Sequence, residues 1–473
     1  MLFNSAQFLI FLPVVMVLYF LFPKKLRWLF LLASSYFFYM CWRWEYIFLI
    51  VGSTVTDYLV AQAIYNSKRE NRRRYLLYLS LGMNLGLLFA FKYFDFFAGS
   101  ANFLFEAGGM GYAIPLLDVI LPVGISFYTF QTLSYTIDVY MGETKPETHF
   151  GIFALFVSFW PQLVAGPIER SSRLLPQFRV AHEFNYERAL WGMTRIAYGF
   201  FKKVVVADRL AIYVNEVYGD LESYPTIPIV LASIFFAFQI YCDFSGYTDI
   251  AIGCAAIMGF TLIENFDRPY LSRSISEFWR RWHISLSTWF RDYVYIPLGG
   301  NRVVKWRWYY NLFLTFLVSG LWHGAAWTFV AWGGLHGVYL IAAILTAPVR
   351  DRMAKTLRLD RIPRLVAGYQ ILLTFTLVVI GWIFFRANGM ADALLVFRKI
   401  WSPDLNFNPS LIMAYKGVYN FLLSFTAVGL LAVSYLLPRD MKLKRPVLFL
   451  IVATIVILLF GKGGSSEFIY FQF

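Results

Sequence analysis

The sequence predicts an all-α membrane protein that crosses the bilayer many times. Of its 473 residues, 59% are hydrophobic and 20% aromatic, while only 15% are charged. A soluble domain carries about 25% charged residues, so this composition excludes an ordinary water-soluble fold. The net charge of +14 comes from basic residues in short loops between apolar runs. That is the positive-inside pattern of membrane proteins, and it predicts no binding to nucleic acid.

Apolar runs recur along the whole chain and predict about eleven or twelve transmembrane helices. Several runs are shorter than the roughly 20 residues that a perpendicular helix needs, so we expect some helices to be tilted, broken or re-entrant. No internal repeat is visible, so the inverted repeats of many transporters are missing. The runs lie near residues 7–22, 28–42, 46–64, 75–97, 116–139, 150–165, 190–206, 226–260, 310–322, 325–346, 366–386, 416–437 and 446–461.

Loop charges predict how these helices are oriented. Clusters of Lys and Arg at 24–27, 68–74, 350–364 and 438–445 are expected on the cytoplasmic side. The stretch 99–115 contains no Lys or Arg and is expected on the other side. With these assignments, both the N-terminus and the C-terminus lie outside. The first apolar run is followed by its basic cluster, so it is expected to be retained as a signal-anchor.

The segment 268–309 differs from the rest because arginines alternate there with aromatic residues. One interpretation is an amphipathic segment at the membrane interface, with arginine side chains extended toward water. The other is a cytoplasmic mouth where cations meet a phosphate-bearing donor. His283 lies in this segment, and a histidine beside arginines is by itself more typical of a structural role. The residue pattern leaves both interpretations open.

His323 is the strongest candidate for a catalytic residue. It is one of only five histidines, and apolar runs flank it on both sides. An ionisable group at membrane depth costs about 2.5–3.5 kcal/mol on insertion scales, so it indicates a functional site rather than a core histidine. Burial favours the neutral imidazole, which can accept the proton of a hydroxyl nucleophile. His336 would lie about 20 Å further along one continuous helix, so the two cannot form a dyad without a break.

No metal or redox site is predicted. The remaining histidines, His149, His182 and His283, lie in polar segments, so no second pair of membrane histidines is present to bind haem. The three cysteines lie in apolar segments and form no CxxC motif, so they indicate neither a disulfide framework nor a metal site.

Two clusters leave alternatives open. Asp243 and Asp249 lie within one apolar run, where carboxylates either couple protons to transport or line a tunnel and lock helices in an enzyme. At the C-terminus, Tyr470 lies in the aromatic cluster 467–473. This cluster is either an interfacial anchor or the support of a positioned phenol that accepts an acyl group.

Together these segments resemble the membrane-bound O-acyltransferase (MBOAT) family, and within it the bacterial branch that O-acetylates alginate. The resemblance covers nearly the whole chain, and the combination of motifs in this order is very specific. The matching motifs are Leu121-Pro122-Val123-Gly124-Ile125-Ser126-Phe127-Tyr128-Thr129-Phe130-Gln131, Val164-Ala165-Gly166-Pro167, Asp243-Phe244-Ser245-Gly246-Tyr247, Phe278–Ser287, Arg291-Asp292-Tyr293, Gly299-Gly300-Asn301-Arg302 and Leu321-Trp322-His323-Gly324.

The resemblance implies an MBOAT fold, in which transmembrane and re-entrant or interfacial helices surround a central tunnel. It implies that His323, in the Trp-His-Gly motif, is catalytic and that His283, in the Arg-Trp-His-x-Ser motif, is the second functional histidine. An acyl thioester would enter from the cytoplasm as a substrate, with no bound cofactor. Residues expected to line the tunnel or the donor mouth are Trp322, Asp243, Ser245, Tyr247, Trp282, Arg281, Arg291 and Asn301.

The implied reaction moves an acyl group, most simply acetyl from acetyl-CoA, across the inner membrane of a bacterium. The acceptor would be a cell-surface polysaccharide such as alginate, or peptidoglycan, reached through an extracytoplasmic partner of the SGNH type. The tail is similar to the C-terminal motif of a small membrane peptide of teichoic acid D-alanylation, whose tyrosine corresponds to Tyr470. The chain is thus expected to contain a core, 1–445, and a last helix with an acyl-relay tail, 446–473. D-alanyl transfer from a carrier protein and a non-enzymatic transporter or flippase stay open as alternatives.

Overall fold

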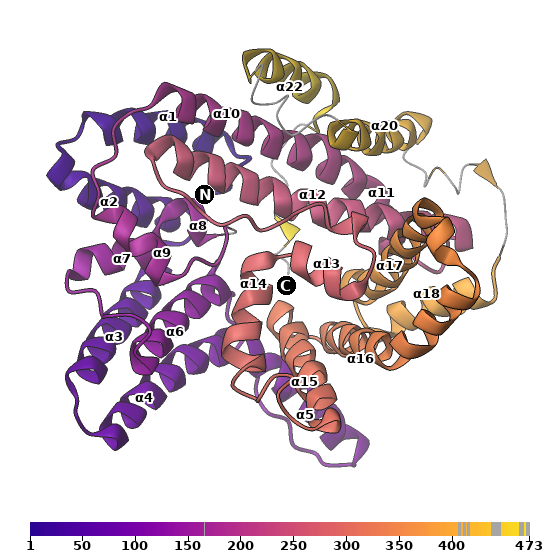
Figure 1. Ribbon diagram of the computed structural model, residues 1–473, viewed down its shortest axis with the longest axis horizontal. Helices are drawn as coiled ribbons and strands as arrows, with labels where there is room; N and C mark the ends of the chain where they lie inside the picture. Colours follow the sequence, from indigo (N-terminus) through magenta and orange to yellow (C-terminus); the bar gives the residue numbers. More distant parts are fainter. Residues whose placement is uncertain are drawn as a thin grey trace.

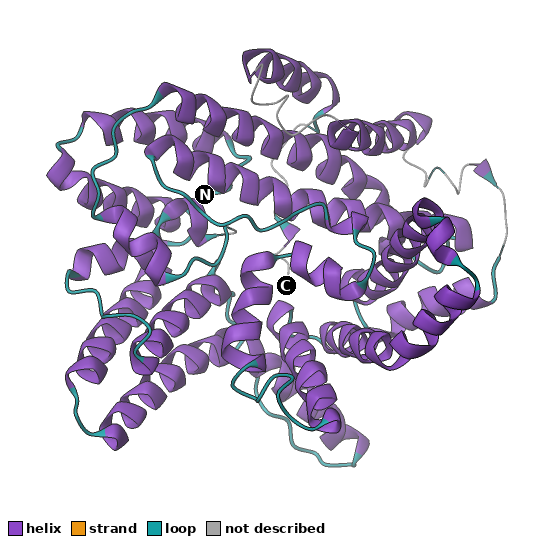
Figure 2. Ribbon diagram, in the orientation of Figure 1, coloured by secondary structure: helices purple, strands orange, loops and turns teal. Residues whose placement is uncertain are grey.

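The computed structural model confirms the all-α, multi-pass fold (Figures 1 and 2). It describes residues 1–164, 166–404, 408–409, 413, 417–436, 446–462 and 468–469, and no strand occurs among them. Within these residues, six helical segments are long and apolar enough to cross a bilayer, and two shorter apolar helices, Ala6–Leu21 and Pro446–Phe460, accompany them. The six are Trp44–Asn66, Glu70–Ala107, Thr226–Met258, Trp327–Thr356, Pro363–Arg386 and Gly417–Tyr435.

Most helices of the first third of the chain lie on the left side of Figure 1, while α5 lies at the bottom beside α15 (Lys305–His323). Helices α3, α4 and α6 meet at the fully buried Asp57. The carboxylate of Asp57 accepts hydrogen bonds from Asn84 (2.9 Å) and Thr136 (3.2 Å), which offset the cost of burying it. The helices are α1 (Ala6–Leu21), α2 (Arg27–Met40), α3 (Ile47–Asn66), α4 (Glu70–Leu88), α5 (Phe94–Ala107), α6 (Ile125–Met141), α7 (Phe150–Ser158), α8 (Trp160–Leu163) and α9 (Ser171–Phe178).

Two of the long helical rods contain a π-helical turn. The first turn, Phe89–Tyr93, joins α4 to α5. The second, Phe201–Ala207, joins α10 (Tyr186–Phe200) to α11 (Asp208–Gly219). Turns of this kind are rare and occur frequently at functional sites. Both carry lysines, and these lysines become important below.

The long helix α12 (Thr226–Met258) runs through the middle of the molecule beside α10. The two helices approach closely at Gly199 and Gly246, where a methyl group on Gly199 would lie 2.6 Å from the carbonyl oxygen of Gly246. Small residues are the usual solution where helices cross closely in a membrane. This contact brings the π-helical turn Phe201–Ala207 against the Asp243–Tyr247 motif.

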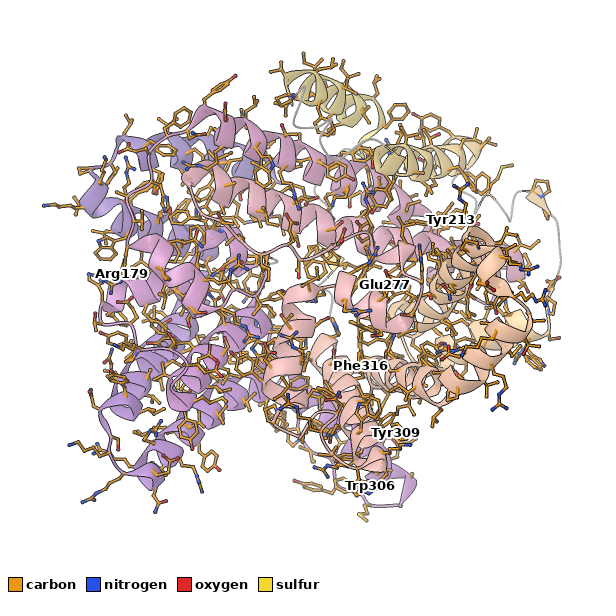
Figure 3. The ribbon with its side chains drawn as sticks, in the orientation of Figure 1. Arg179, Tyr213, Glu277, Trp306, Tyr309 and Phe316 are labelled. Atoms are coloured by element: carbon orange, nitrogen blue, oxygen red, sulfur yellow. The ribbon has the colours of Figure 1, made fainter. Side chains whose placement is uncertain are left out.

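The centre of the molecule is closed by two short helices and a helical hairpin. The short helices are α13 (Ile275–Arg281) and α14 (Ile284–Phe290), and the hairpin consists of α15 (Lys305–His323) and α16 (Trp327–Thr356). Phe316 of α15, labelled in Figure 3, packs on Trp279 of α13 with ring centroids 5.0 Å apart. Thus the part of the arginine-rich segment that forms α13 and α14 packs at the protein centre.

The last helices cover the outside of this centre. Helix α22 packs against α10, and the backbone N–H of Lys462 donates to the carbonyl of Val204 over 3.0 Å. Residues 446–462 are therefore packed on the core, while the division at 445 stays a prediction. These helices are α17 (Pro363–Arg386), α18 (Met390–Trp401), α20 (Gly417–Leu436) and α22 (Pro446–Phe460).

Candidate active site

His323 is the last residue of α15 and is buried. Its imidazole meets Trp332 edge to face, with ring centroids 4.9 Å apart, and Phe385 at 5.6 Å. Such aromatic contacts hold a ring in one orientation. The side chain is thus fixed within a mostly apolar centre.

The glycine of the Trp-His-Gly motif has a steric reason. The helix ends because Gly324 is extended, with φ −161°. A methyl group on Gly324 would lie 2.2 Å from two carbons of the Phe329 ring. One turn earlier, a methyl group on Gly320 would lie 2.3 Å from the carbonyl oxygen of Phe329. Both glycines let α16 approach α15 closely, and this approach sets the position of His323.

His283 is fully buried and adopts a left-handed backbone conformation, with φ +43°. A left-handed non-glycine residue is strained, and such strain clusters at functional sites. The turn is held from both sides by Asn265, whose carbonyl accepts the N–H of Ile284 (2.9 Å) and whose side-chain oxygen accepts the hydroxyl of Ser285 (2.9 Å). Ser285 in turn accepts the N–H of Ile168 (3.1 Å). The Arg-Trp-His-x-Ser motif is therefore a strained turn that aims His283 inward.

The two predicted functional histidines meet in the centre of the molecule. The ring centroids of His283 and His323 are 6.3 Å apart, and the ring of Trp322 lies 6.1 Å from His283. His336 takes a different position, where its Nδ1 accepts a hydrogen bond from the indole N–H of Trp279 over 3.2 Å. The fold thus pairs His323 with the distant His283 and gives His336 a packing role.

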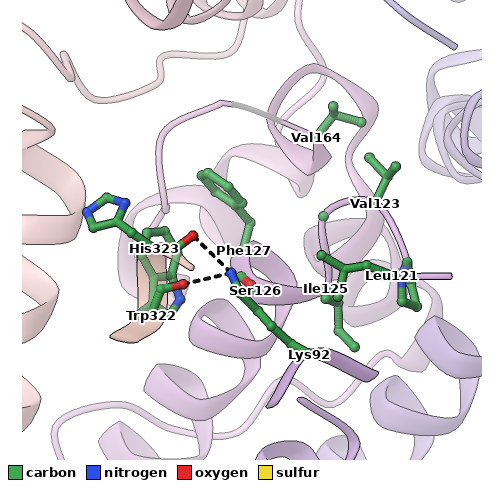
Figure 4. A pocket seen from close by; sticks show the side chains of 11 residues that line it. Lys92, Leu121, Val123, Ile125, Ser126, Phe127, Val164, Trp322 and His323 are labelled. Atoms are coloured by element: carbon green, nitrogen blue, oxygen red, sulfur yellow. Dashed lines mark hydrogen bonds between the residues drawn. The ribbon is translucent and has the colours of Figure 1, made fainter. Parts of the chain in front are cut away.

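Three cavities lie near the histidines, and His323 itself lines one of them. The smallest, which we call the histidine chamber, has a volume of about 40 Å³ and is lined by His323, Trp322, Phe127 and Lys92, among others (Figure 4). A water needs about 10–15 Å³ of such space, so the chamber has room for roughly three or four water-sized groups. That is about the size of an acetyl group.

The second cavity, which we call the arginine cavity, lies between α13, α14, α15 and α16 and has a volume of about 480 Å³. Arg280 and Arg291 line it together with mostly apolar side chains. Ser319 also lines it, and this residue lies about one helical turn before His323 on α15. The cavity therefore extends from two cations toward the C-terminal end of α15.

The third cavity, which we call the amide cavity, has a volume of about 540 Å³ and is lined by Lys92, Arg386 and the side chains of Asn215, Gln239 and Asn388, among others. No Asp or Glu lines it among the residues described. Arg386 ends α17, a helix that begins beside the basic segment 350–364. The amide cavity therefore lies toward the end of α17 opposite that segment.

The predicted lining residues fall into different places. Trp322 lines the histidine chamber and Arg291 lines the arginine cavity, while Trp282 is fully buried beside Trp382. Arg281 instead pairs with Glu277 one turn earlier (2.7 Å). Asn301 lies in an exposed turn outside the cavities described here.

The carboxylates of α12 are held in ion pairs. Asp243 pairs with Lys203 of the π-helical turn (2.5 Å), which also pairs with Asp208 (2.9 Å), while Asp249 pairs with Arg195 (2.6 Å) and Lys202. These contacts join α10 and the π-helical turn that follows it to α12.

Ser245 and Tyr247, the other predicted residues of the Asp243–Tyr247 motif, lie near these ion pairs. Ser245 accepts a hydrogen bond from Lys202 (2.9 Å) and lines a separate charged cavity of about 570 Å³. Tyr247 is buried between Phe3 and Phe468, with ring centroids 5.3 Å and 4.5 Å away. Neither side chain lines the histidine chamber.

Two described residues of the C-terminal tail, Phe468 and Ile469, lie at this centre. The N–H of Ile469 donates to the second carboxylate oxygen of Asp243 over 2.8 Å, and Phe468 is fully buried. Ile469 also lines the amide cavity. Tyr470, the predicted acyl acceptor, follows Ile469 in the sequence and lies outside the described residues.

Sequence reasoning missed two groups that support the site. Lys92 donates hydrogen bonds to the carbonyl oxygens of Trp322 (2.8 Å) and His323 (3.2 Å). A lone lysine in an apolar run was the available signal. Glu169 accepts the N–H of Ile263 next to the turn that carries Ser285, and burial raises its pKa to about 7. Its signal was a single carboxylate after the Gly166-Pro167 motif.

Comparison with known proteins tests the family resemblance. Residues 147–385 match the membrane-bound O-acyltransferase family. The chain is 42% identical over 406 residues to a probable alginate O-acetylase of Pseudomonas aeruginosa, covering 85% of this chain and 75% of that protein. It is 38% identical over 434 residues to a peptidoglycan O-acetyltransferase of Helicobacter pylori, covering 84% and 79%. A teichoic acid D-alanyltransferase of Bacillus subtilis is more distant, at 30% identity over 249 residues, covering 48% and 60%. The chain belongs to the membrane-bound O-acyltransferase family.

Proposed function

We propose that this membrane-bound acyltransferase takes an acetyl group from cytoplasmic acetyl-CoA and transfers it across the membrane for O-acetylation of a cell-surface polysaccharide or peptidoglycan. The observation that carries the proposal is the position of His323, which lines the histidine chamber while Ser319 of the same helix lines the arginine cavity. The names of the most similar relatives, an alginate O-acetylase and a peptidoglycan O-acetyltransferase, support an acetyl group and a cell-surface acceptor.

The arginine cavity is the proposed donor site. Guanidinium groups bind phosphate oxygens with paired hydrogen bonds, so Arg280 and Arg291 suit the phosphates of CoA. The apolar wall between these arginines and Ser319 suits a thioester-bearing arm. A carrier protein would instead need a docking surface, and the distant D-alanyltransferase relative gives that alternative less support. We propose that no cofactor stays bound to the enzyme.

The proposed chemistry is the transfer of one acyl group from the thioester sulfur of the donor to a hydroxyl oxygen of the acceptor. The hydroxyl oxygen of the acceptor attacks the thioester carbonyl carbon, and His323 takes the hydroxyl proton. The new C–O bond forms, the C–S bond breaks, and the departing sulfur takes a proton, so that an acetyl ester and CoA thiol result. General-base catalysis of this kind contributes about 10²–10⁴-fold. His283, 6.3 Å from His323, is the second catalytic histidine and assists at the sulfur.

Tyr470 is the proposed first acceptor. The support is its neighbour Ile469, which is anchored to Asp243 and lines the amide cavity. A covalent ester on Tyr470 would divide the transfer into two easier steps. An extracytoplasmic SGNH-type partner would then pass the acetyl group to the polymer. In this proposal residues 1–445 perform the first transfer and residues 446–473 relay its product.

The proposed location is the inner membrane of a bacterium, with both chain termini outside and lipid around the helices. The support is the distribution of Lys and Arg, since the basic segments 24–27, 68–74 and 350–364 share one side under the positive-inside pattern. The amide cavity, at the far end of α17 from segment 350–364, would then open away from the cytoplasm. Donor and acceptor would approach His323 from opposite sides.

Intact-protein mass spectrometry after incubation with acetyl-CoA tests this proposal. We expect the purified wild-type protein and the buried control variant His336→Gln to gain one acetyl group, and His323→Ala and Tyr470→Phe to gain none. An adduct that survives Tyr470→Phe would overturn the relay. An unchanged adduct in His323→Ala would overturn the role of His323, and failure of the wild type would overturn acetyl-CoA as donor.

A further inference from the structure

Lys92 has an unusual position for a lysine. It lies in the π-helical turn Phe89–Tyr93, within the candidate membrane span Glu70–Ala107. A lysine at membrane depth is costly and usually has a function. No ion pair joins Lys92 to a carboxylate in the described part of the chain. Its ammonium group instead donates to the carbonyl oxygens of Trp322 (2.8 Å) and His323 (3.2 Å) (Figure 4).

These two carbonyls belong to the end of the helix that carries the catalytic histidine. The last carbonyls of an α-helix have no partner within the helix, and a cation there also interacts favourably with the helix dipole. Gly324 is extended and ends α15 at this point. Lys92 therefore connects α4–α5 to the C-terminus of α15, although the two are more than 200 residues apart in sequence.

The ammonium group also lies where two cavities meet. Lys92 lines both the histidine chamber and the amide cavity. Its reach follows from the π-helical turn, which inserts an extra residue into the rod and rotates the side chains around it. Stabilising the helix end would not by itself require Lys92 to line both cavities.

We propose that Lys92 is a positioning residue for acyl transfer. By holding the carbonyls of Trp322 and His323, it fixes the end of α15 and thereby the imidazole of His323 between the donor and acceptor cavities. This inference rests on the proposed function of His323. A shift of about 1 Å in a reacting group can cost about 10²-fold in rate, so the effect of Lys92 is expected in kcat rather than in binding of the donor.

Lys399 provides a matched control. Its ammonium group likewise donates to backbone carbonyls, those of Leu221 (2.6 Å), Glu222 (2.8 Å) and Tyr224 (2.7 Å). It lines none of the three cavities around His323. Replacing it removes a similar set of lysine–carbonyl hydrogen bonds and leaves the end of α15 intact.

The rate at which full-length protein in lipid nanodiscs gains its acetyl group, measured over a range of acetyl-CoA concentrations, tests the inference. The limiting rate gives kcat for this first transfer, and the acetyl-CoA concentration at half the limiting rate gives KM. We expect Lys92→Met to lower kcat about 10²-fold with KM for acetyl-CoA within about twofold, Lys92→Arg to recover most of the loss, and Lys399→Met to keep wild-type kcat. If Lys92→Met does not fold, Lys92→Gln, which keeps an N–H donor without the charge, replaces it, and a reduced kcat at unchanged KM is again expected.

The inference is overturned if the Lys92 variants keep the kcat of Lys399→Met, or if KM changes instead of kcat. It is also overturned if Lys92→Arg is no better than Lys92→Met. Failure of the proposed function is distinguishable, because the wild type itself would then transfer no acetyl group, or His323→Ala would transfer it at the wild-type rate.

Discussion

Adding a single methyl group at Gly324 should displace His323, the proposed base. The φ of −161° at Gly324 is extended backbone, which any residue can adopt, so the substitution Gly324→Ala has no conformational cost of its own. Its cost comes from Phe329, because the new methyl carbon would lie 2.2 Å, 2.2 Å and 2.8 Å from three carbons of that ring. Ordinary carbon contacts are about 3.5–4.0 Å, so either the ring or the end of α15 must move by more than 1 Å.

The clash should change both the stability of the protein and the rate of acetyl transfer. Overpacking of this kind typically costs about 1–3 kcal/mol of stability. If the end of α15 moves, the misplacement of His323 should lower kcat about 10²-fold. Both quantities can be measured on the purified protein, as a thermal unfolding midpoint and as the rate of acetyl transfer at saturating acetyl-CoA.

A second substitution tests the cause. Phe329→Leu removes two of the three clashing ring carbons, so Gly324→Ala/Phe329→Leu should be more active than Gly324→Ala alone. The reasoning is refuted if Gly324→Ala keeps wild-type kcat. It is also refuted if the kcat of the double variant is lower than the product of the two single effects on kcat predicts. In that case the clash between the methyl group and the ring would not be the cause of the loss.

Three further predictions concern other parts of the site. His283→Gly should be more stable than His283→Ala by about 1 kcal/mol, because only glycine adopts φ +43° without strain, and both should be inactive; an active glycine variant would contradict a functional His283. Arg291→Ala should raise KM for acetyl-CoA with little change in kcat, while Arg281→Ala, whose guanidinium pairs with Glu277, should change neither; equal effects would contradict the arginine cavity as donor site. Glu169, whose pKa is raised by burial from 4.5 to about 7, holds a proton in the folded state that the unfolded state releases. Its contribution to stability is therefore full below about pH 4.5 and is lost as the pH rises to 7. The thermal unfolding midpoint of the wild type should therefore decrease as the pH is raised from 5 to 8, and that of Glu169→Gln should decrease less. An equal decrease in both proteins would contradict the prediction.

Much of the fold and the burial of His323 could be predicted from the sequence. Composition and loop charges predict a multi-pass membrane protein, because a bilayer requires apolar segments of known length. His323 was recognisable because an ionisable group between apolar runs is rare and costly. The Trp-His-Gly and Arg-Trp-His-x-Ser motifs then predicted a functional pair, and the rings of His283 and His323 do lie 6.3 Å apart.

The rest depended on contacts between distant segments. Arg280 and Arg281 are neighbours in sequence, yet only Arg280 lines the arginine cavity, because α13 turns Arg281 toward Glu277. Asp243 could be identified as a buried carboxylate, but its contacts with Lys203 and with the N–H of Ile469 join segments that no local pattern relates. The contacts of Lys92 could not be predicted for the same reason, because the carbonyls that it binds lie at the distant end of α15.

The central claim is that His323 is the base of the acyl transfer, and single-turnover kinetics tests it most directly. The rate of acetyl transfer would be measured for wild type, His323→Ala and the buried control His336→Gln, with acetyl-CoA in excess and the protein in nanodiscs. The account predicts a fall of about 10²–10⁴-fold for His323→Ala, with acetyl-CoA binding retained and His336→Gln close to wild type. A rate for His323→Ala within a few-fold of His336→Gln would contradict it.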